Sequence, residues 1–427
     1  MALVPAPPEP TFYRSKSAEP FAFLLGELGT DMRWTSVMST QSNPDVALGV
    51  LIDAIRDQLE GAPADLMLVF ASGYSEDSWG VFTAELRNAF PDATILGCSA
   101  GGVIGGGREM ENGTAISVTV ASLPDVAVVG FHHDGEVSAS IAEAAQSWQD
   151  RLGLEPEHQP SFLVIPDPYS CDPIQLLSGL DRAYPASVKL GGLASGGDGP
   201  GDHILVLDDD THRGGAVGVA LYGDIEVATV VAQGCRPVGE PLVITRCEKN
   251  ILIELNGQSA LSQLERLFAD LETEDQALFR ALPMVGLGME KGRGSYRQGD
   301  FLIRHLMGMD RNNGVLAVGA LAEEGQVVQF HVRDADSSRV DFEELLTQHS
   351  RTHAVDLSEG ALLFSCLGRG ERFFGVPDHD SGMATRYLGG VPIGGFFCAG
   401  EIGPVNGQTW LHGYTSVLGI FRSRGWS

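Results

Sequence analysis

The sequence predicts an α/β protein, with a mixed α+β arrangement also possible, whose two domains are built from pseudo-repeated helix-strand-helix-strand-hairpin units with mixed sheets. Two observations lead to this prediction. The chain of 427 residues is longer than a single hydrophobic core usually supports. In its N-terminal half, two helical patterns alternate with two short apolar runs and end in a glycine-rich turn, and this order occurs twice.

The first copy follows a Pro-rich lead-in, residues 1–34, that we expect to be mobile. A helix is predicted after Asn43, because apolar residues then recur at helical spacing and Asn43-Pro44 suits a cap and first turn. The apolar run 66–70 predicts a buried strand. The other predicted elements are a helix at 81–90, a strand at 94–97 before the turn 98–102, and a hairpin of 115–121 with 126–132.

The second copy repeats this order with nearly the same spacing, which rarely arises by chance. Its predicted elements are a helix at 140–152, a strand at 162–165, a helix at 174–184, a strand at 188–190 before the turn 191–197, and a hairpin of 216–222 with 225–231. Together the two copies are expected to form a first domain over residues 35–238.

A second domain is predicted over residues 239–427, where the pattern changes. Its expected elements are paired strands at 242–245 and 251–254, a helix at 260–271, a hairpin of 315–320 with 327–332, and a helix at 342–349. This last helix and the stretch 361–405 complete a third, degenerate copy of the repeated unit.

Composition excludes several classes of function. A formal net charge of −28 leaves no basic surface for phosphates, so we expect no nucleic acid partner. The six cysteines form neither CxxC nor Cys/His patterns, so we expect no metal site and reduced thiols in a cytoplasmic protein. No apolar run approaches the length of about 18 residues that membrane insertion needs. Neither a GxGxxG after a first strand nor a P-loop occurs, and no cofactor is expected.

The stretch 361–405 carries the strongest indication of a binding site. One apolar run ends in Ser365-Cys366 and is followed by a turn that contains Arg369. A second ends in Cys398 and is followed by Glu401. Two strand ends therefore place an arginine, a glutamate and two thiols in glycine-rich loops, whose backbone N–H groups can approach a small ligand closely.

In their order along the chain, several motifs resemble those of the FIST family, whose FIST N and FIST C domains occur together. The matching stretches are TILGCSAGG at 94–102, LGGLASGG at 190–197, DFLIRHLMGMD at 300–310, GQVVQFHVRDA at 325–335, FSCLGRG at 364–370 and GFFCAGEIGP at 395–404. The resemblance covers residues 35 to 425. It implies a sensory protein that binds a small ligand such as an amino acid and passes its state to a separate signalling protein.

A free amino acid needs one partner for its carboxylate and another for its ammonium group. A guanidinium suits the first and an unpaired carboxylate the second. We therefore expect Arg369 to hold the carboxylate and Glu401 the ammonium, with Arg304 and Arg333 as further candidates for the anion. The other expected pocket residues are Cys98, Ser99, Gly101, Gly191, Gly192, Ser195, Cys366, Cys398 and Gly400.

Each of these residues also has a purely structural interpretation. The arginine and the glutamate expected to bind the ligand can instead pair with each other or hold turns. Arg304 and Arg333 lie near Asp300 and Asp334 in the sequence, which can neutralise them. Buried cysteines are commonly apolar fillers, serines cap their own loops, and glycines let backbones turn or pack.

Two other functions remain open at this point. A cysteine-dependent hydrolase or transferase would use Cys98, Cys366 or Cys398 as the nucleophile and His379 or His412 as its base. A scaffold that binds only proteins would need an exposed apolar patch and no ligand.

Overall fold

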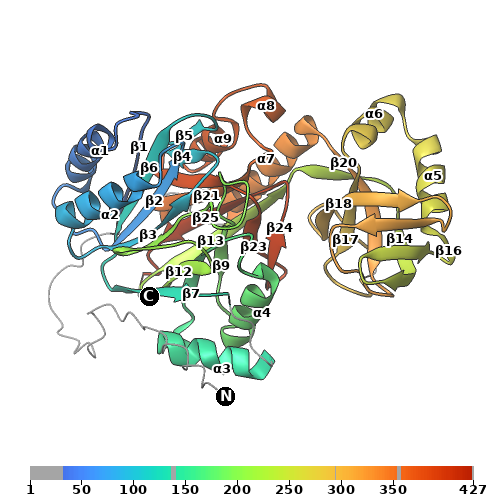
Figure 1. Ribbon diagram of the computed structural model, residues 1–427, viewed down its shortest axis with the longest axis horizontal. Coiled ribbons are helices and arrows are strands. Elements are labelled where there is room, and N and C mark those ends of the chain that lie inside the picture. Colours follow the sequence, from blue (N-terminus) through green and yellow to red (C-terminus); the bar gives the residue numbers. More distant parts are fainter. Residues whose placement is uncertain (1–31, 136–140, 294, 353–356, 426–427) are drawn as a thin grey trace, which may run out of the picture.

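The computed structural model describes residues 32–135, 141–293, 295–352 and 357–425. The Pro-rich lead-in up to residue 31, and residue 140 at the predicted start of a helix, lie outside the described residues. The described chain forms three α/β units around one core, with a β-barrel inserted into the third unit (Figure 1). The mixed α/β class predicted from the sequence is confirmed.

The first two units have the same order of elements. The first consists of β1 (Arg33–Ser39), α1 (Pro44–Leu59), β2 (Leu66–Ser72), α2 (Asp77–Ala89), β3 (Thr94–Ser99), β4 (Val103–Gly105), β5 (Arg108–Met110) and β6 (Ala115–Ser122). The second consists of β7 (Val126–His133), α3 (Ile141–Leu152), the 3-10 helix η1 (Pro156–His158), β8 (Ser161–Pro166), α4 (Pro173–Ala183), β9 (Lys189–Gly192), β10 (Leu205–Leu207), β11 (Asp210–His212) and β12 (Ala216–Gly223).

The third unit is complete rather than degenerate, but the inserted barrel separates its first strand from the rest. It consists of β13 (Glu226–Gln233), then α7 (Ala335–Thr352), β21 (Gly360–Cys366), α8 (Glu371–Phe374), α9 (His379–Tyr387), β22 (Ile393–Cys398), β23 (Glu401–Val405), β24 (Gln408–His412) and β25 (Thr415–Arg422). The sheet of this unit therefore joins strands from both sides of residue 238, and β13 pairs with β25 along its whole length.

The three sheets share one strand order, and each receives a hairpin from another unit. The orders are β1-β6-β2-β3-β10-β11, β7-β12-β8-β9-β23-β24 and β13-β25-β21-β22-β4-β5. The third and fourth strands of each order are parallel, and the other pairings are antiparallel. Because the hairpins are exchanged cyclically, the three units have threefold pseudo-symmetry and interlock.

Three glycines occupy equivalent positions in the parallel pairs. A Cβ added to Gly97, Gly191 or Gly395 would lie 2.1, 2.0 or 1.9 Å from a carbonyl oxygen of the neighbouring parallel strand. Side chains cannot be accommodated at such distances, so only glycine fits at these points of close backbone approach. The glycine pattern in the sequence therefore reflects the packing of the parallel strands.

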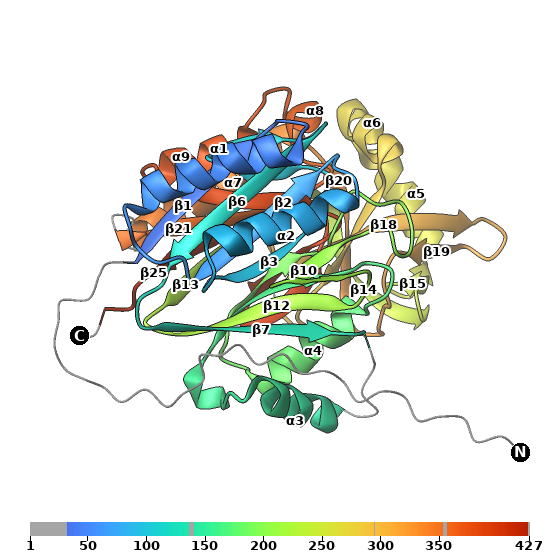
Figure 2. The same cartoon turned by 60° about the vertical axis from the view of Figure 1, so that its left-hand side comes forward.

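A pair of helices covers the outer face of each sheet, and the inner faces enclose the common core (Figure 2). Helix α1 illustrates the local cause. It begins where Asn43 Oδ1 accepts a hydrogen bond of 3.1 Å from the backbone N–H of Val46 and Pro44 fills the first turn. Most of its apolar side chains pack against the sheet, among them the buried Leu48, Leu51 and Ile55.

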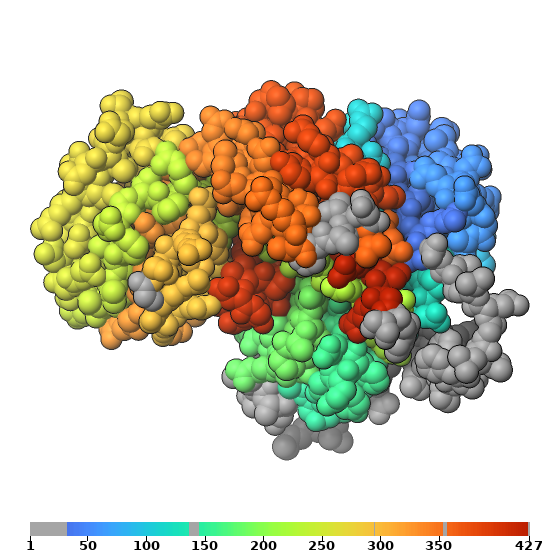
Figure 3. Space-filling model, turned by 180° about the vertical axis from the view of Figure 1, so that it is seen from behind, coloured from blue at the N-terminus to red at the C-terminus, as the bar shows by residue number. Residues whose placement is uncertain are grey.

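The inserted part is an antiparallel barrel beside the core, visible from behind next to α7 (Figures 1 and 3). Its elements are β14 (Cys235–Glu248), β15 (Ile251–Leu255), β16 (Gln258–Ser259), α5 (Ala260–Asp270), α6 (Thr273–Ala281), β17 (Met284–Gly288), β18 (Phe301–Asp310), β19 (Val315–Val318) and β20 (Val327–Arg333). The strand order is β14-β20-β17-β18-β19-β15-β16, and pairing of β14 with β15 closes the barrel.

Three predicted hairpins are wrong. The strands β6 and β7 belong to different sheets, as do β12 and β13. In the barrel, β19 pairs with β18 and β15, whereas β20 pairs with β14 and β17. In the first two cases the turn is short but the chain passes from one sheet to another, and in the third case both strands join the same barrel sheet without being neighbours. The residues of a turn do not determine which of these arrangements forms. The predicted pairing of 242–245 with 251–254 is found between β14 and β15.

Candidate functional site

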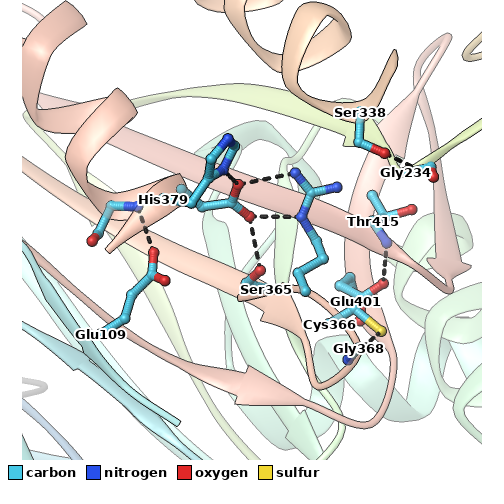
Figure 4. Close-up of polar contacts among 12 residues, drawn as sticks. Glu109, Gly234, Ser338, Ser365, Cys366, Gly368, His379, Glu401 and Thr415 are labelled. Atoms are coloured by element: carbon cyan, nitrogen blue, oxygen red, sulfur yellow. Dashed lines mark hydrogen bonds and ion pairs between the residues drawn. The ribbon is translucent and has the colours of Figure 1, made fainter. Parts of the chain in front are cut away.

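The candidate site lies where the barrel leaves and re-enters the third unit. Strand β14 starts at Cys235 and β20 ends at Arg333, and these two residues are register partners. The loops after β21 and β22, which the sequence singled out, meet the barrel at this junction. Figure 4 shows part of the resulting polar network.

Arg369 is fully buried and its carboxylate partner is Asp380 in α9. Its Nε and Nη2 atoms donate to Asp380 Oδ2 and Oδ1 at 2.6 and 3.0 Å. Asp380 also accepts from Ser365 Oγ at 3.0 Å and contacts His379 Nδ1 at 2.9 Å (Figure 4). Although burial opposes its ionisation, the Arg369 guanidinium holds the pKa of Asp380 below its usual value. Arg369 Nη1 is buried and has no hydrogen-bond partner among the described residues.

Arg333 approaches the same loop from the barrel. Its Nη2 donates to the carbonyl oxygen of Gly368. Its guanidinium lies over the rings of Phe373 and Tyr414, 4.0 and 5.1 Å from their centroids. Burial lowers the pKa of Arg333, and the positive charge of Arg369 adds to this effect. Its Nε atom is buried and finds no partner in the part of the chain that the structure describes.

Glu401 is completely buried at the start of β23. Its Oε2 accepts a hydrogen bond of 3.0 Å from the backbone N–H of Thr415, and the thiol of Cys398 lies 3.7 Å from Oε1. Burial raises the pKa of Glu401 to about 8, although the Thr415 N–H and the charge of Arg369 favour its ionised form. At neutral pH most of this carboxyl group is therefore protonated.

Arg304 links β18 of the barrel to the third unit. It donates from Nη1 to the carbonyl of Ile303 and from Nη2 to the carbonyl of Leu411, both at 2.8 Å. Burial lowers its pKa, and the neighbouring Glu401 acts in the opposite direction. Arg304 and Arg369 therefore both lie close enough to Glu401 to act on it electrostatically, and Arg333 acts in the same way on Arg369.

The aspartates expected to neutralise two of these arginines have other partners. Asp300 pairs with Arg293, with Nη1 and Oδ1 2.7 Å apart. Asp334 pairs with Arg236 at 2.9 Å. Neither Arg304 nor Arg333 has a carboxylate within ion-pair distance among the described residues.

The other predicted pocket residues lie mainly along the pseudo-symmetry axis, where all three units meet. Ser195 Oγ accepts from the backbone N–H of Gly101 at 2.9 Å and donates to the carbonyl of Phe397 at 2.5 Å. Ser99 Oγ accepts from Ile204 N at 3.0 Å. The remaining residues pack tightly in this region: Cys98, Gly191, Gly192, Cys398 and Gly400.

The environments of the thiols do not favour a cysteine nucleophile. Burial raises the pKa of all six cysteines, including that of Cys366 to about 12. Where the described thiols form hydrogen bonds, their partners are backbone groups and Glu401. In the described chain no hydrogen bond joins a thiol to His379 or His412, whose ring nitrogens contact Asp380 and the carbonyl of Gly403.

Sequence reasoning missed two buried side chains at this junction, Gln233 and His331. Gln233 Nε2 donates to the carbonyl of Phe301 at 2.6 Å, and Gln233 Oε1 has no partner among the described residues. His331 Nδ1 lies 3.0 Å from the carbonyl of Gln329, and Nε2 is likewise without a described partner. The family-like stretch 325–335 contains His331, but nothing in its spacing indicated that Gln233 would lie nearby.

Two surface hollows lie away from this junction. One of about 660 Å³ follows α7 and is lined by Val340, Glu343, Glu344, Thr347, Gln348, Arg351, Thr352 and Tyr387. The other, of about 220 Å³, lies between α4 and β24 and is lined by Ser178, Asp181, Arg182, Pro185, Gly407 and Gln408. None of the predicted site residues lines either hollow.

Among the described residues, no group of three His, Cys, Asp or Glu side chains is arranged to hold a metal ion. The described helices include none that is both long and apolar enough to cross a membrane.

Two curated relatives are similar over most of their length. The uncharacterized protein Rv0628c of Mycobacterium tuberculosis (strain ATCC 25618 / H37Rv) is 36% identical over 366 residues, which cover 86% of this chain and 93% of the relative. The uncharacterized protein Mb0898c of Mycobacterium bovis (strain ATCC BAA-935 / AF2122/97) is 34% identical over 367 residues, covering 86% and 92%. Among solved structures, cyanuric acid hydrolase from A. caulinodans aligns over 92% of this chain and 100% of its own, with a TM-score of 0.33 and 10% identity.

Two family models match consecutive parts of the chain. The FIST N domain matches residues 65–258, and the FIST C domain matches residues 260–404. FIST domains are associated with signal transduction and with the sensing of small ligands. Because the two matches together span most of the sequence, this protein belongs to the FIST family.

Proposed function

We propose that this protein is a cytoplasmic sensor that binds a small carboxylate ligand, an amino acid or a similar metabolite, at the junction of the barrel and the third unit. A separate signalling protein would distinguish the ligand-bound state of the sensor from the empty state. The observation that carries the proposal is a pair of guanidinium groups, that of the half-buried Arg333 and that of the fully buried Arg369, each with one buried N–H nitrogen that has no partner among the described residues.

The charges around these groups favour an anion. Asp380 is engaged by Arg369, and Glu401 is mostly neutral at pH 7 because burial raises its pKa to about 8. Arg304 and Arg333 add positive charge without a carboxylate partner of their own in the described chain. A ligand carboxylate would accept hydrogen bonds from Arg333 Nε and Arg369 Nη1 and would compensate the excess charge.

Glu401 is the proposed partner of the ligand's ammonium group. An ammonium close to a carboxyl group favours its ionised form and lowers its pKa. Glu401 would therefore lose a proton when an amino acid binds. The consequence is that proton release accompanies binding near neutral pH, and that affinity rises as the pH approaches 8.

The position of the site explains how a ligand could enter and how binding could be signalled to a partner protein. Arg333, Cys366, Gly368 and Tyr414 are partly exposed above the buried Arg369 and Glu401, so a rim faces solvent. Arg333 belongs to one of the two strands that join the barrel to the core. A ligand that bridges this strand and the loop of Arg369 would favour one orientation of the barrel, and a partner protein can distinguish the two populations.

A thermal-shift screen of amino acids and related carboxylates tests the proposal. A ligand at about 100 times its dissociation constant stabilises a fold by roughly 2.7 kcal/mol, which raises the melting temperature measurably. The shift should disappear in Arg333→Gln and persist in Arg372→Gln, a control at an exposed position in α8. A ligand that binds Arg333→Gln with unchanged affinity contradicts the assigned site. A flat screen with intact protein contradicts the sensor and favours a scaffold.

A further inference from the structure

Two buried hydrogen-bond acceptors lie at the junction without partners among the described residues, Gln233 Oε1 and His331 Nε2. The orientation of Gln233 is fixed because its Nε2 donates to the carbonyl of Phe301 at 2.6 Å. The tautomer of His331 is fixed because Nδ1 contacts the carbonyl of Gln329 at 3.0 Å, and a carbonyl can only accept. The hydrogen is therefore on Nδ1, and Nε2 presents a lone pair.

Both acceptors are next to the groups proposed to bind the ligand's backbone. His331 and Arg333 are two residues apart on β20, so their side chains lie on the same face of the strand. Gln233 is the register partner of Thr415, whose N–H holds Glu401. The next residue, Gly234, passes so close that a Cβ on it would lie 3.2 Å from Arg369 Nη1.

The two residues both contact Phe301, and the surroundings of the His331 ring are apolar, whereas the backbone N–H of Gln233 donates to Asp341 Oδ2 at 2.8 Å. The His331 ring packs edge-on against Phe301, with centroids 5.2 Å apart. Phe301 in turn belongs to a buried cluster with Cys235 and Met284, against which Tyr414 packs. Burial lowers the pKa of His331 to about 4, so the ring is neutral at physiological pH and remains an acceptor.

Two buried neutral acceptors discriminate among ligand side chains. A carboxylate would bring a negative charge against two lone pairs, and an ammonium or guanidinium would lose its hydration without gaining a counter-charge. An aliphatic side chain would leave both acceptors unpaired. A carboxamide offers two N–H donors from one nitrogen and carries no charge, so it can satisfy both acceptors.

We propose that Gln233 and His331 form the side-chain subsite of this sensor and select amino acids that end in a carboxamide. This inference rests on the proposed function, because it assumes that Arg333, Arg369 and Glu401 hold the ligand's carboxylate and ammonium. It adds the specificity that those three residues do not supply, since every free amino acid carries the groups that they recognise.

Calorimetric titration of the full chain with matched ligands tests the subsite. Glutamine is compared with glutamate and methionine, and asparagine with aspartate and leucine, because each set has similar size and differs in its terminal group. At least one amide should bind about tenfold more tightly than both of its analogues. A protein that binds amino acids without preferring the amide contradicts the subsite alone. A protein that binds no amino acid contradicts the proposed function and this inference with it.

Substitution locates the discrimination in the two side chains. His331→Phe keeps a ring and removes Nε2, and it should reduce the preference for the amide over methionine or leucine about tenfold. Gln233→Met offers a second variant of similar length if the first is poorly folded. Undiminished discrimination in a folded variant contradicts the role of the substituted residue. If neither variant folds, the ligand comparison with the natural sequence still decides.

Discussion

Arg369 and Asp380 form a two-point ion pair in the buried centre of the candidate site. Two guanidinium nitrogens of Arg369 donate to the two carboxylate oxygens of Asp380 at 2.6 and 3.0 Å. The pair joins the loop after β21 to α9, and the rings of Phe374 and His379 stack beside it, with centroids 3.5 Å apart. The residue predicted to hold a ligand carboxylate therefore already binds a carboxylate of the protein, and only its Nη1 is free of described partners.

Replacement of Arg369 by Ala should destabilise the fold as well as change the site. Removing one partner of a buried ion pair leaves the other charge uncompensated, which costs about 3–5 kcal/mol. Denaturant unfolding measures this loss. The double variant Arg369→Ala/Asp380→Ala should lose less than the sum of the single variants, because neither charge is then left alone. Additive losses would contradict the pairing. For this reason Arg333, and not Arg369, is the residue to substitute in binding experiments.

Ser195 connects all three units at the pseudo-symmetry axis through Gly101 and Phe397. Ser195→Ala leaves a buried N–H and a buried carbonyl without their shared partner, and should lower the free energy of unfolding by roughly 1–3 kcal/mol. Chemical denaturation followed by tryptophan fluorescence is a suitable measurement. The control is Ser178→Ala at an exposed position of α4, which should change stability by less than about 0.5 kcal/mol. Equal effects of the two substitutions would show that Ser195 does not join the units.

The repeated unit could be predicted because its helices and strands follow from local patterns of apolar residues. The run 66–70 has apolar side chains on both faces, which is typical of a strand covered on both sides, and β2 is buried at every position. These local patterns do not determine which sheet a strand joins. Only three residues separate β6 from β7, yet these strands lie in different sheets, because pairing depends on the distant β1 and β12.

The arginines of the site could also be identified from local sequence patterns. Their hydrogen-bonding partners could not. Arg304, Arg333 and Arg369 each lie in or next to a short recognisable motif, and the fold brings them to the junction of the barrel and the third unit. The partner of Arg369 is on α9, eleven residues away, and depends on how this helix packs on the sheet. Gln233 and His331 both contact Phe301 because the barrel is inserted after β13, so this arrangement is a consequence of the whole topology.

The three equivalent glycines should tolerate no side chain. Gly395→Ala places a Cβ 1.9 Å from the carbonyl oxygen of Leu363 at a φ of +144°, so the parallel strands must separate. We expect a loss of roughly 3 kcal/mol or more, or failure to fold. Gly191→Ala should behave alike, because its Cβ meets Val164 in the same way. The matched control is Gly80→Ala in α2, where the added Cβ meets nothing within 4 Å and stability should rise by about 0.5–1 kcal/mol. Soluble yield and thermal unfolding separate these outcomes, and a stable Gly395→Ala would contradict the close approach of β21 and β22.

Glu401 should make stability fall as the pH rises. Its pKa is about 8 in the folded protein and near 4.5 in the unfolded chain, so the folded state binds the proton more tightly. The stabilising contribution of the protonated group is complete below about pH 4.5 and is lost as the pH rises to 8 and above. In Glu401→Gln the group no longer titrates, while the amide oxygen can still accept from Thr415. The variant should therefore gain stability relative to the natural protein between pH 5 and 8.5, by about 1.4 kcal/mol for each unit of pKa shift that is realised. Denaturant unfolding of both proteins at matched pH values measures this difference.

Contributions from Glu109 and Asp341, whose pKa values burial raises to about 7 and 6, are present in both proteins and cancel. A difference that stays constant with pH would mean that Glu401 is ionised in the folded state, and the proposed release of a proton on ligand binding would then be wrong.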